Sequence, residues 1–122
     1  MIFRPELAAK VLDGTKTVTR RILRSNKVPY RRDRVYAVQP GRGKRHIGHV
    51  VVDDVTEGLL GDVDDREARA EGFESAAAFA DYWRTLHGGN FDPAQRVTVI
   101  RFARTYFDAF CCAEMGTKGE ER

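Results

Sequence analysis

The chain has 122 residues, 42% of them hydrophobic and 32% charged, a composition that indicates one folded domain with a single core and excludes a disordered chain. No apolar run reaches the length of a membrane span, and the N-terminus lacks the apolar core of a secretory signal, so we expect a cytoplasmic protein with no membrane partner. The formal net charge of +3 conceals a strong separation of charge along the chain.

The first predicted element is a short helix from residue 4 to residue 12. Pro5 suits its first turn, Leu7 and Val11 lie on one face, and Gly14 stands where a left-handed cap is required. The following segment, GTKTVTRR, is therefore expected to be a loop that leaves the end of a helix. A Walker loop instead follows a strand, opens a helix and needs an earlier glycine where this chain has Ala9, so a triphosphate cradle is excluded.

Residues 34–38 alternate like a strand, and residues 46–56 contain a longer one. The connection between them, PGRGKR, has the glycines of a flexible hairpin and carries three cations: Arg42, Lys44 and Arg45. His46 and His49 are three positions apart on the second strand, so we expect their side chains on opposite faces. No histidine spacing suits a metal, and we predict neither a metal site nor a cofactor.

The second half of the chain predicts two helices and a strand. A short helix within residues 63–73 is capped by Asp64, with Glu67 three positions later, and is closed by Gly72. A second helix covers residues 75–86, and its apolar stripe, which includes Phe79 and Trp83, is interpreted as core. Residues 97–102 alternate as a closing strand. The pattern predicts an α+β domain with a small β-sheet or barrel.

We place the domain at residues 1–104 and a C-terminal extension at residues 105–122. Residues 105–114 have the pattern of a last short helix, and the tail from Met115 is expected to be disordered. Cys111 and Cys112 are adjacent, a spacing that strains a disulfide, so free thiols in a reducing compartment are expected.

Charge is divided between the two halves of the domain. Residues 1–50 contain 13 Lys or Arg and 3 Asp or Glu, whereas residues 51–92 contain 3 and 11. Such polarity indicates a cationic face for an anionic partner, most often nucleic acid, but two halves that neutralise each other in the fold would give the same count. A basic run from Arg20 through Arg24 to Arg34 includes Tyr30, an aromatic residue of the type that stacks on bases; such runs are also common on solvated faces.

Several side chains of the GTKTVTRR segment could bind a ligand or take part in catalysis. Lys16 is a mobile charge for phosphate, or an amine whose pKa falls if it is desolvated, and Arg21 offers a two-pronged donor for phosphate or a carbonyl group. Thr19 is either functional or simply bonded to the backbone of a turn, and Lys16 on its own is as well explained as a solvated loop residue. Glu71 near the end of the acidic helix is either an exposed charge or, if it reaches the loop, a partner for Lys16.

The segment also carries the motif G-x-K-x-x-T-x-R, matched by Gly14, Lys16, Thr19 and Arg21. With AEGF (residues 70–73), FADYW in the next helix and the closing VTVIRF, this order resembles the ASCH domains, relatives of the PUA-like RNA-binding barrels, over residues 3–103. The resemblance implies a PUA-like α+β fold whose basic cleft binds RNA or a nucleotide. The residues expected to bind the ligand are Gly14, Thr17, Arg20, Arg21, Arg24, Tyr30, Arg42, Lys44 and Arg45.

The same resemblance implies an alternative, because some small bacterial ASCH proteins are amidohydrolases that remove the acetyl group from acetylated cytidine. Carried over to this chain, the catalytic set is Thr19 as nucleophile, Lys16 as its activator and Glu71 as the group that orients or exchanges protons. Other members are described as metal-dependent ribonucleases. The arginine-rich segment and the basic hairpin depart from the smallest hydrolases and favour an anionic ligand larger than a nucleoside.

Overall fold

The structure, a computed structural model, describes residues 1–22 and 29–105. Its elements in chain order are α1 (Pro5–Asp13), β1 (Val18–Arg21), β2 (Val35–Val38), β3 (Gly48–Leu59), the 3-10 helix η1 (Leu60–Asp62), α2 (Asp65–Ala70), α3 (Ala76–Leu86) and β4 (Arg96–Arg104). The strands form one antiparallel sheet in the order β1-β4-β3-β2. The predicted α+β class is confirmed. The predicted helix over residues 105–114, apart from Thr105, and the tail with both cysteines lie outside the described residues.

The segment predicted as a loop after α1 contains the edge strand β1. Val18 lies opposite Arg101 of β4, and Arg21 lies opposite Thr98. The strand has only four residues, VTRR, so its polar sequence carries no recognisable alternation. It forms because β4 provides a long partner from the other end of the domain, which only the tertiary structure supplies.

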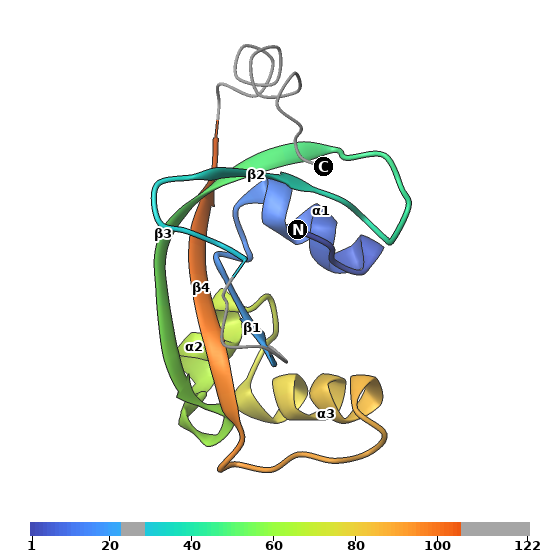
Figure 1. The fold of residues 1–122 in the computed structure, drawn as a ribbon. Coiled ribbons are helices and arrows are strands. Elements are labelled where there is room, and N and C mark those ends of the chain that lie inside the picture. Colours follow the sequence, from blue (N-terminus) through green and yellow to red (C-terminus); the bar gives the residue numbers. More distant parts are fainter. Residues whose placement is uncertain (23–28, 106–122) are drawn as a thin grey trace.

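The long strand β3 is sharply bent. Val52 pairs with Phe102 and Asp54 with Arg101, so Asp53 is an extra residue that forms a bulge. A bulge increases the local twist and bends the strand. Figure 1 shows β3 curving with β2 over α1, which gives the sheet the shape of a half-barrel. β3 extends past the segment in which the strand was predicted, residues 46–56, because β4 pairs with it as far as Leu59.

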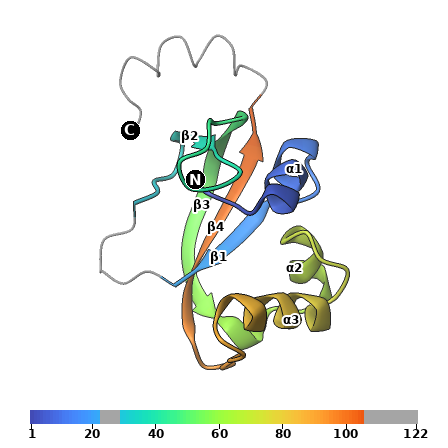
Figure 2. The same cartoon turned by 90° about the vertical axis from the view of Figure 1, so that its right-hand side faces the viewer.

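The helices cover the concave side of this curled sheet (Figure 2). The helix caps follow the sequence signals: the side chain of Asp64 accepts a hydrogen bond from the Glu67 amide, and Ser75 accepts one from Ala78. No helix within residues 1–22 and 29–105 is long and apolar enough to cross a membrane.

Two clusters of buried side chains form the core. One joins α1 to the curved end of the sheet and consists of Phe3, Leu7, Ala8, Val11, Val38, Val50, Val52, Ile100 and Phe102. The other joins α2 and α3 to the straight end and consists of Val18, Leu60, Val63, Ala68, Phe79, Trp83, Val97 and Val99. Phe73 packs against both clusters. The fold therefore leaves a junction between two small cores, with β1 passing beside it.

Candidate functional site

Lys16 is a buried lysine at this junction, with only 2% of its surface exposed. Gly14 ends α1 in the left-handed conformation, as predicted, and the Lys16 amide then donates to the carbonyl of Lys10. The Lys16 side chain is thereby directed inward. Its Nζ donates to the Val18 carbonyl at 2.9 Å, to the Glu71 carbonyl at 2.8 Å and to Glu71 Oε1 at 2.8 Å. Three acceptors match the three donors of an ammonium group.

Glu71 reaches Lys16 because of the way α2 ends. Glu71 is the C-terminal cap of α2, and Gly72 follows with a φ of 100°. A Cβ at Gly72 would lie 3.2 Å from Cδ of Lys10 and 3.6 Å from Cβ of Lys16, so both conformation and space favour glycine here. The turn is fastened to the segment before β1 by the Thr17 amide, which donates to the Ala70 carbonyl. Glu71 is 3% exposed, so the predicted pair of Lys16 and Glu71 is a buried ion pair.

The ion pair belongs to a longer chain of alternating charges. Arg20 Nη1 donates to the second oxygen of Glu71, Oε2, at 3.0 Å, and its Nη2 contacts Glu67 Oε1. Arg101 Nη2 donates to the same Glu67 oxygen at 2.7 Å. The fork of Arg20 thus bridges two carboxylates through two separate nitrogens, a spread that the single nitrogen of a lysine does not match. Arg20 holds Glu71 so that its other oxygen faces Lys16.

Burial and charge alter the acidity of two members of this chain. Desolvation lowers the pKa of Lys16 from its ordinary value, although Glu71 opposes the change. The hydrogen bond from Arg101, followed by that from Arg20, lowers the pKa of Glu67. The lowered pKa of Lys16 increases the share of neutral amine, the form that can accept a proton.

Thr19 lies on β1 beside this ion pair. It is 6% exposed and, within residues 1–22 and 29–105, its hydroxyl makes no hydrogen bond. A buried hydroxyl without a partner is costly unless a ligand or water completes it. Thr19, Lys16, Arg20 and Glu71 all line one cavity, so this hydroxyl is available to a bound molecule.

The cavity has a volume of about 470 Å³ and lies at the junction of the two cores. Its wall is mainly apolar and aromatic, formed by Phe3, Leu7, Phe73, Phe79, Tyr82 and Trp83. Its polar groups are the four residues above with Arg4, Arg21 and His87. An apolar cavity of this size with a few grouped polar side chains is the usual form of a small-molecule site.

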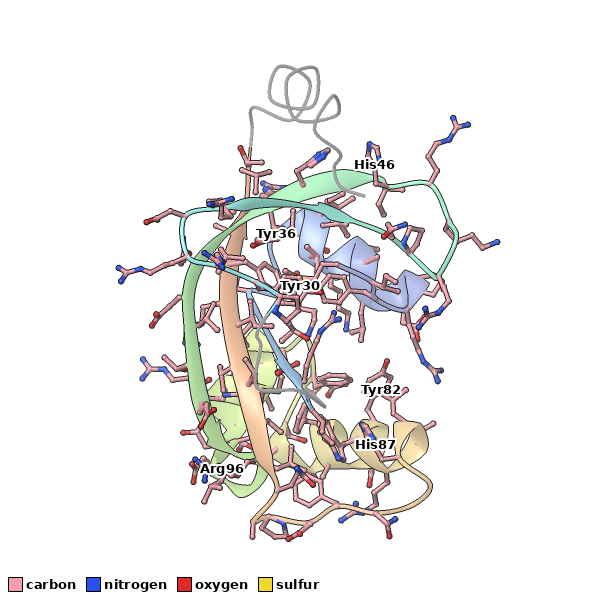
Figure 3. The ribbon with its side chains drawn as sticks, in the orientation of Figure 1. Tyr30, Tyr36, His46, Tyr82, His87 and Arg96 are labelled. Carbon is pink, nitrogen blue, oxygen red and sulfur yellow. The ribbon has the colours of Figure 1, made fainter. Side chains whose placement is uncertain are left out.

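Two aromatic groups lie apart in the molecule. Tyr82 and His87 lie at α3, whereas Tyr30 and Tyr36 lie towards β2 (Figure 3). On the α3 side, the His87 ring stacks on Trp83 with centroids 4.3 Å apart. Only the α3 group belongs to the cavity wall.

Known proteins resemble this chain in structure. No family model and no curated protein matches the sequence. The crystal structure of an ASCH domain from Lactobacillus crispatus superposes with a TM-score of 0.69 at 15% identity, covering 81% of this chain and 70% of that one. ASCH from Zymomonas mobilis gives 0.61 at 18% identity, covering 85% and 67%. Protein EF3133 from Enterococcus faecalis, assigned to DUF984, gives 0.61 at 16% identity, covering 82% and 70%.

The chain has the ASCH fold. The half-barrel, the helices on its concave side and the order of elements match the PUA-like α+β architecture expected from the sequence. At these identities the likeness concerns the fold alone.

On this ASCH fold, the predicted catalytic set meets in one place, because Lys16, Thr19 and Glu71 all line the cavity. Arg20 and Arg21 line it as well. Arg21 Nη2 donates to the Ile2 carbonyl at 2.8 Å, and its guanidinium lies over the ring of Phe3 at 5.1 Å.

The other predicted ligand-binding residues do not line the cavity, and Arg24 lies outside the described residues. Gly14 and Thr17 are exposed and do not line it, and Tyr30 makes an edge contact with Tyr36 at 5.1 Å. The exposed cations Arg42, Lys44 and Arg45 follow Gly41, which does line the cavity.

The prediction that His46 and His49 lie on opposite faces of a strand was wrong. The rings of His46 and His49 meet edge to face, with centroids 5.1 Å apart. His46 precedes β3, which begins at Gly48, so the alternation of a strand does not apply to it. No cluster of three His, Cys, Asp or Glu suited to a metal occurs within the described ranges.

Sequence reasoning missed the apolar wall, Arg4 and the pair formed by Glu67 with Arg101. Phe79 and Trp83 were interpreted as core, and they are core residues whose other side faces the cavity. Glu67 was noticed only as a capping residue, whereas its side chain binds Arg20 and Arg101. The helical spacing of Phe79 and Trp83 was the sequence signal that could have indicated the apolar wall, since it places both residues on the same side of the helix as Tyr82.

Proposed function

We propose that this protein binds RNA or a nucleotide, with one nucleobase held in the cavity beside Lys16 and Glu71. The observation that carries the proposal is an aromatic cavity of about 470 Å³ with a buried, hydrogen-bonding polar end. Bases stack on aromatic rings and present several hydrogen-bonding atoms at their edges, so both parts of the cavity suit a base. Thr19 offers a hydroxyl without a partner among the described residues.

The basic loop supports RNA as a ligand that extends past the cavity. Pro40 and Gly41 line the cavity, and the exposed Arg42, Lys44 and Arg45 follow directly. A strand with one base in the cavity therefore has cations within reach for neighbouring phosphates. If about four to six phosphates are neutralised, the logarithm of affinity falls with the logarithm of salt concentration with a slope of about −3 to −4 for single strands.

The test is titration of short single-stranded RNA at several salt concentrations, followed by the fluorescence of Trp83, which lines the cavity and is the single tryptophan of the chain. Replacing Arg42, Lys44 and Arg45 together with glutamine should reduce the slope. Thr19→Val should weaken binding with little change in slope, because it removes a contact to the base. An affinity that is independent of salt would contradict binding of an RNA backbone, and an unchanged affinity in Thr19→Val would contradict use of the cavity.

A second candidate is hydrolysis of the amide of acetylated cytidine, favoured by the unpartnered Thr19 hydroxyl in the same cavity as Lys16. Thr19 Oγ1 would attack the amide carbonyl as its proton passes to neutral Lys16 Nζ. Lys16 would return the proton to the amine that leaves, and water would then release acetate from Thr19. The three acceptors around Nζ fit an ammonium, so this role requires loss of one proton first, which the lowered pKa of Lys16 assists.

Release of acetate from N4-acetylcytidine tests this candidate. Thr19→Val preserves size and should abolish turnover, whereas Thr56→Val, an exposed position on β3, should leave it unchanged. Urea unfolding of both variants shows whether a loss reflects folding. Turnover that persists in Thr19→Val contradicts the nucleophile, and its absence in the wild-type protein contradicts the reaction.

A further inference from the structure

The charges around the cavity are not balanced. Among its lining residues are four cationic side chains, from Arg4, Lys16, Arg20 and Arg21, and one carboxylate, from Glu71. Lys16 and Arg20 are both paired, with Glu71 and, for Arg20, also with Glu67. Arg4 and Arg21 are the two remaining cationic side chains of the lining.

Within residues 1–22 and 29–105, neither Arg4 nor Arg21 forms an ion pair with a carboxylate. Arg21 donates one hydrogen bond to the Ile2 carbonyl and lies over the rings of Phe3, at 5.1 Å, and Tyr30, at 6.0 Å. Arg4 lies over the ring of Tyr82 at 5.7 Å. Contact with a ring face satisfies no N–H group, so most guanidinium donors of both residues remain available.

The two arginines line the same cavity, and both lie next to Phe3: Arg4 follows it in the chain, and the Arg21 guanidinium lies over its ring. Arg21 is bonded to the carbonyl of Ile2, two residues before Arg4, and the backbone between those residues spans roughly 7 Å at most. The charge of Arg21 also reaches the ion pair, because Arg21 contributes to the lowering of the pKa of Lys16. Among the described residues, no carboxylate pairs with these two arginines, so the cavity has a positive edge near Phe3, beside its aromatic wall.

We infer that Arg4 and Arg21 form a phosphate-binding subsite at this edge, so that the ligand in the cavity is a phosphorylated nucleoside and not a neutral one. The inference rests on the proposed function and specifies its ligand class. Guanidinium groups match phosphate oxygens in geometry and charge, and the half-buried position of Arg21 reduces screening by solvent. The phosphate comes either from a free nucleotide or from the backbone of RNA whose base occupies the cavity.

The experiment compares the affinities of cytidine, cytidine 5′-monophosphate, cytidine 3′-monophosphate and the dinucleotide CpC by calorimetry. We expect at least one monophosphate to bind about tenfold or more tightly than cytidine. Inorganic phosphate at millimolar concentration should compete with that monophosphate and leave cytidine binding unaffected. A dinucleotide that exceeds both monophosphates identifies an RNA backbone as the source, whereas a monophosphate that equals or exceeds it identifies a free nucleotide.

The variants Arg4→Gln and Arg21→Gln, singly and together, test the assignment. In the double variant, the ratio of monophosphate affinity to cytidine affinity should fall towards one. Arg34→Gln removes the same charge at an exposed position outside the cavity and should keep the wild-type ratio. Arg21→Lys keeps the charge and most of the stem, so it gives a folded comparison if Arg21→Gln is unstable; its ratio should be intermediate.

Three outcomes contradict the inference. Equal binding of cytidine and both monophosphates by the wild-type protein removes the subsite and leaves the proposed function standing. A ratio that survives in the double variant places the phosphate elsewhere. Failure of all four ligands to bind overturns the proposed function and this inference with it.

Discussion

Replacing Lys16 with methionine tests how the buried ion pair contributes to stability. Methionine retains much of the side-chain volume and removes the ammonium. Three acceptors lose their donor: Glu71 Oε1 and the carbonyls of Glu71 and Val18, at 2.8, 2.8 and 2.9 Å. The matched change, Glu71→Gln, removes the carboxylate charge while retaining an acceptor. The two substitutions and their combination form a double-mutant cycle.

The expected magnitude follows from what remains after each change. Breaking a buried ion pair by removing one partner costs about 3–5 kcal/mol when the other charge is left alone. In Lys16→Met, Glu71 is not alone, because Arg20 still contacts its Oε2 at 3.0 Å. We therefore expect a loss of about 2–3 kcal/mol in the free energy of unfolding for Lys16→Met and about 3 kcal/mol for Glu71→Gln. The double variant should lose at least about 1 kcal/mol less than the sum.

Urea unfolding measures these energies, with Trp83 as the reporter. It is the only tryptophan in the sequence and is 6% exposed, so its emission should shift on unfolding. Lys44→Met, at an exposed loop position, controls for the loss of a lysine and should remain within about 0.5 kcal/mol of the wild type. A loss below about 1 kcal/mol for Lys16→Met, or strict additivity in the cycle, would refute the reasoning.

Three further results are expected. Because the pKa of Lys16 is lowered in the folded state, folding releases a proton between that pKa and the ordinary 10.5. The stability of the wild type relative to Lys16→Met should thus rise with pH in that window and stay level below it; urea midpoints that fall there would contradict the assigned direction. Gly72→Ala should cost more than Gly14→Ala, which itself costs about 1–2 kcal/mol, because both φ angles are positive but only Gly72 is crowded; equal losses of unfolding free energy would argue against the crowding. Arg20→Lys should lower stability by about 1–2 kcal/mol and impair binding, since one nitrogen does not match the separate contacts that Nη1 and Nη2 make with Glu71 and Glu67; retention of both in urea unfolding and titration would show that the bridge is dispensable.

The sequence predicted the helices well because their signals are local. Pro5 and Gly14 mark the ends of α1, and Asp64 and Ser75 cap α2 and α3 with side-chain hydrogen bonds that span three residues. Strand β1 was missed because its pairing with β4 is not local. His46 was misplaced because a histidine just before a strand does not follow the alternation of that strand.

The features of the site likewise divide into those that local sequence predicts and those that depend on tertiary contacts. The residue types near Gly14 and at the end of the acidic helix made Lys16, Thr19 and Glu71 candidates, and the resemblance to ASCH domains suggested that they face one cleft. The sequence by itself therefore determined the helices α1 to α3 with their caps, the approximate positions of β2, β3 and β4, and the residue types at the site. Only the tertiary structure decided that Lys16 is buried against Glu71, that Arg20 bridges Glu71 to Glu67, and that two cores meet around a cavity with Arg4 and Arg21 at its edge. Burial and ion pairing depend on which distant segments share a boundary, and that is set by the packing of the whole curled sheet and its helices.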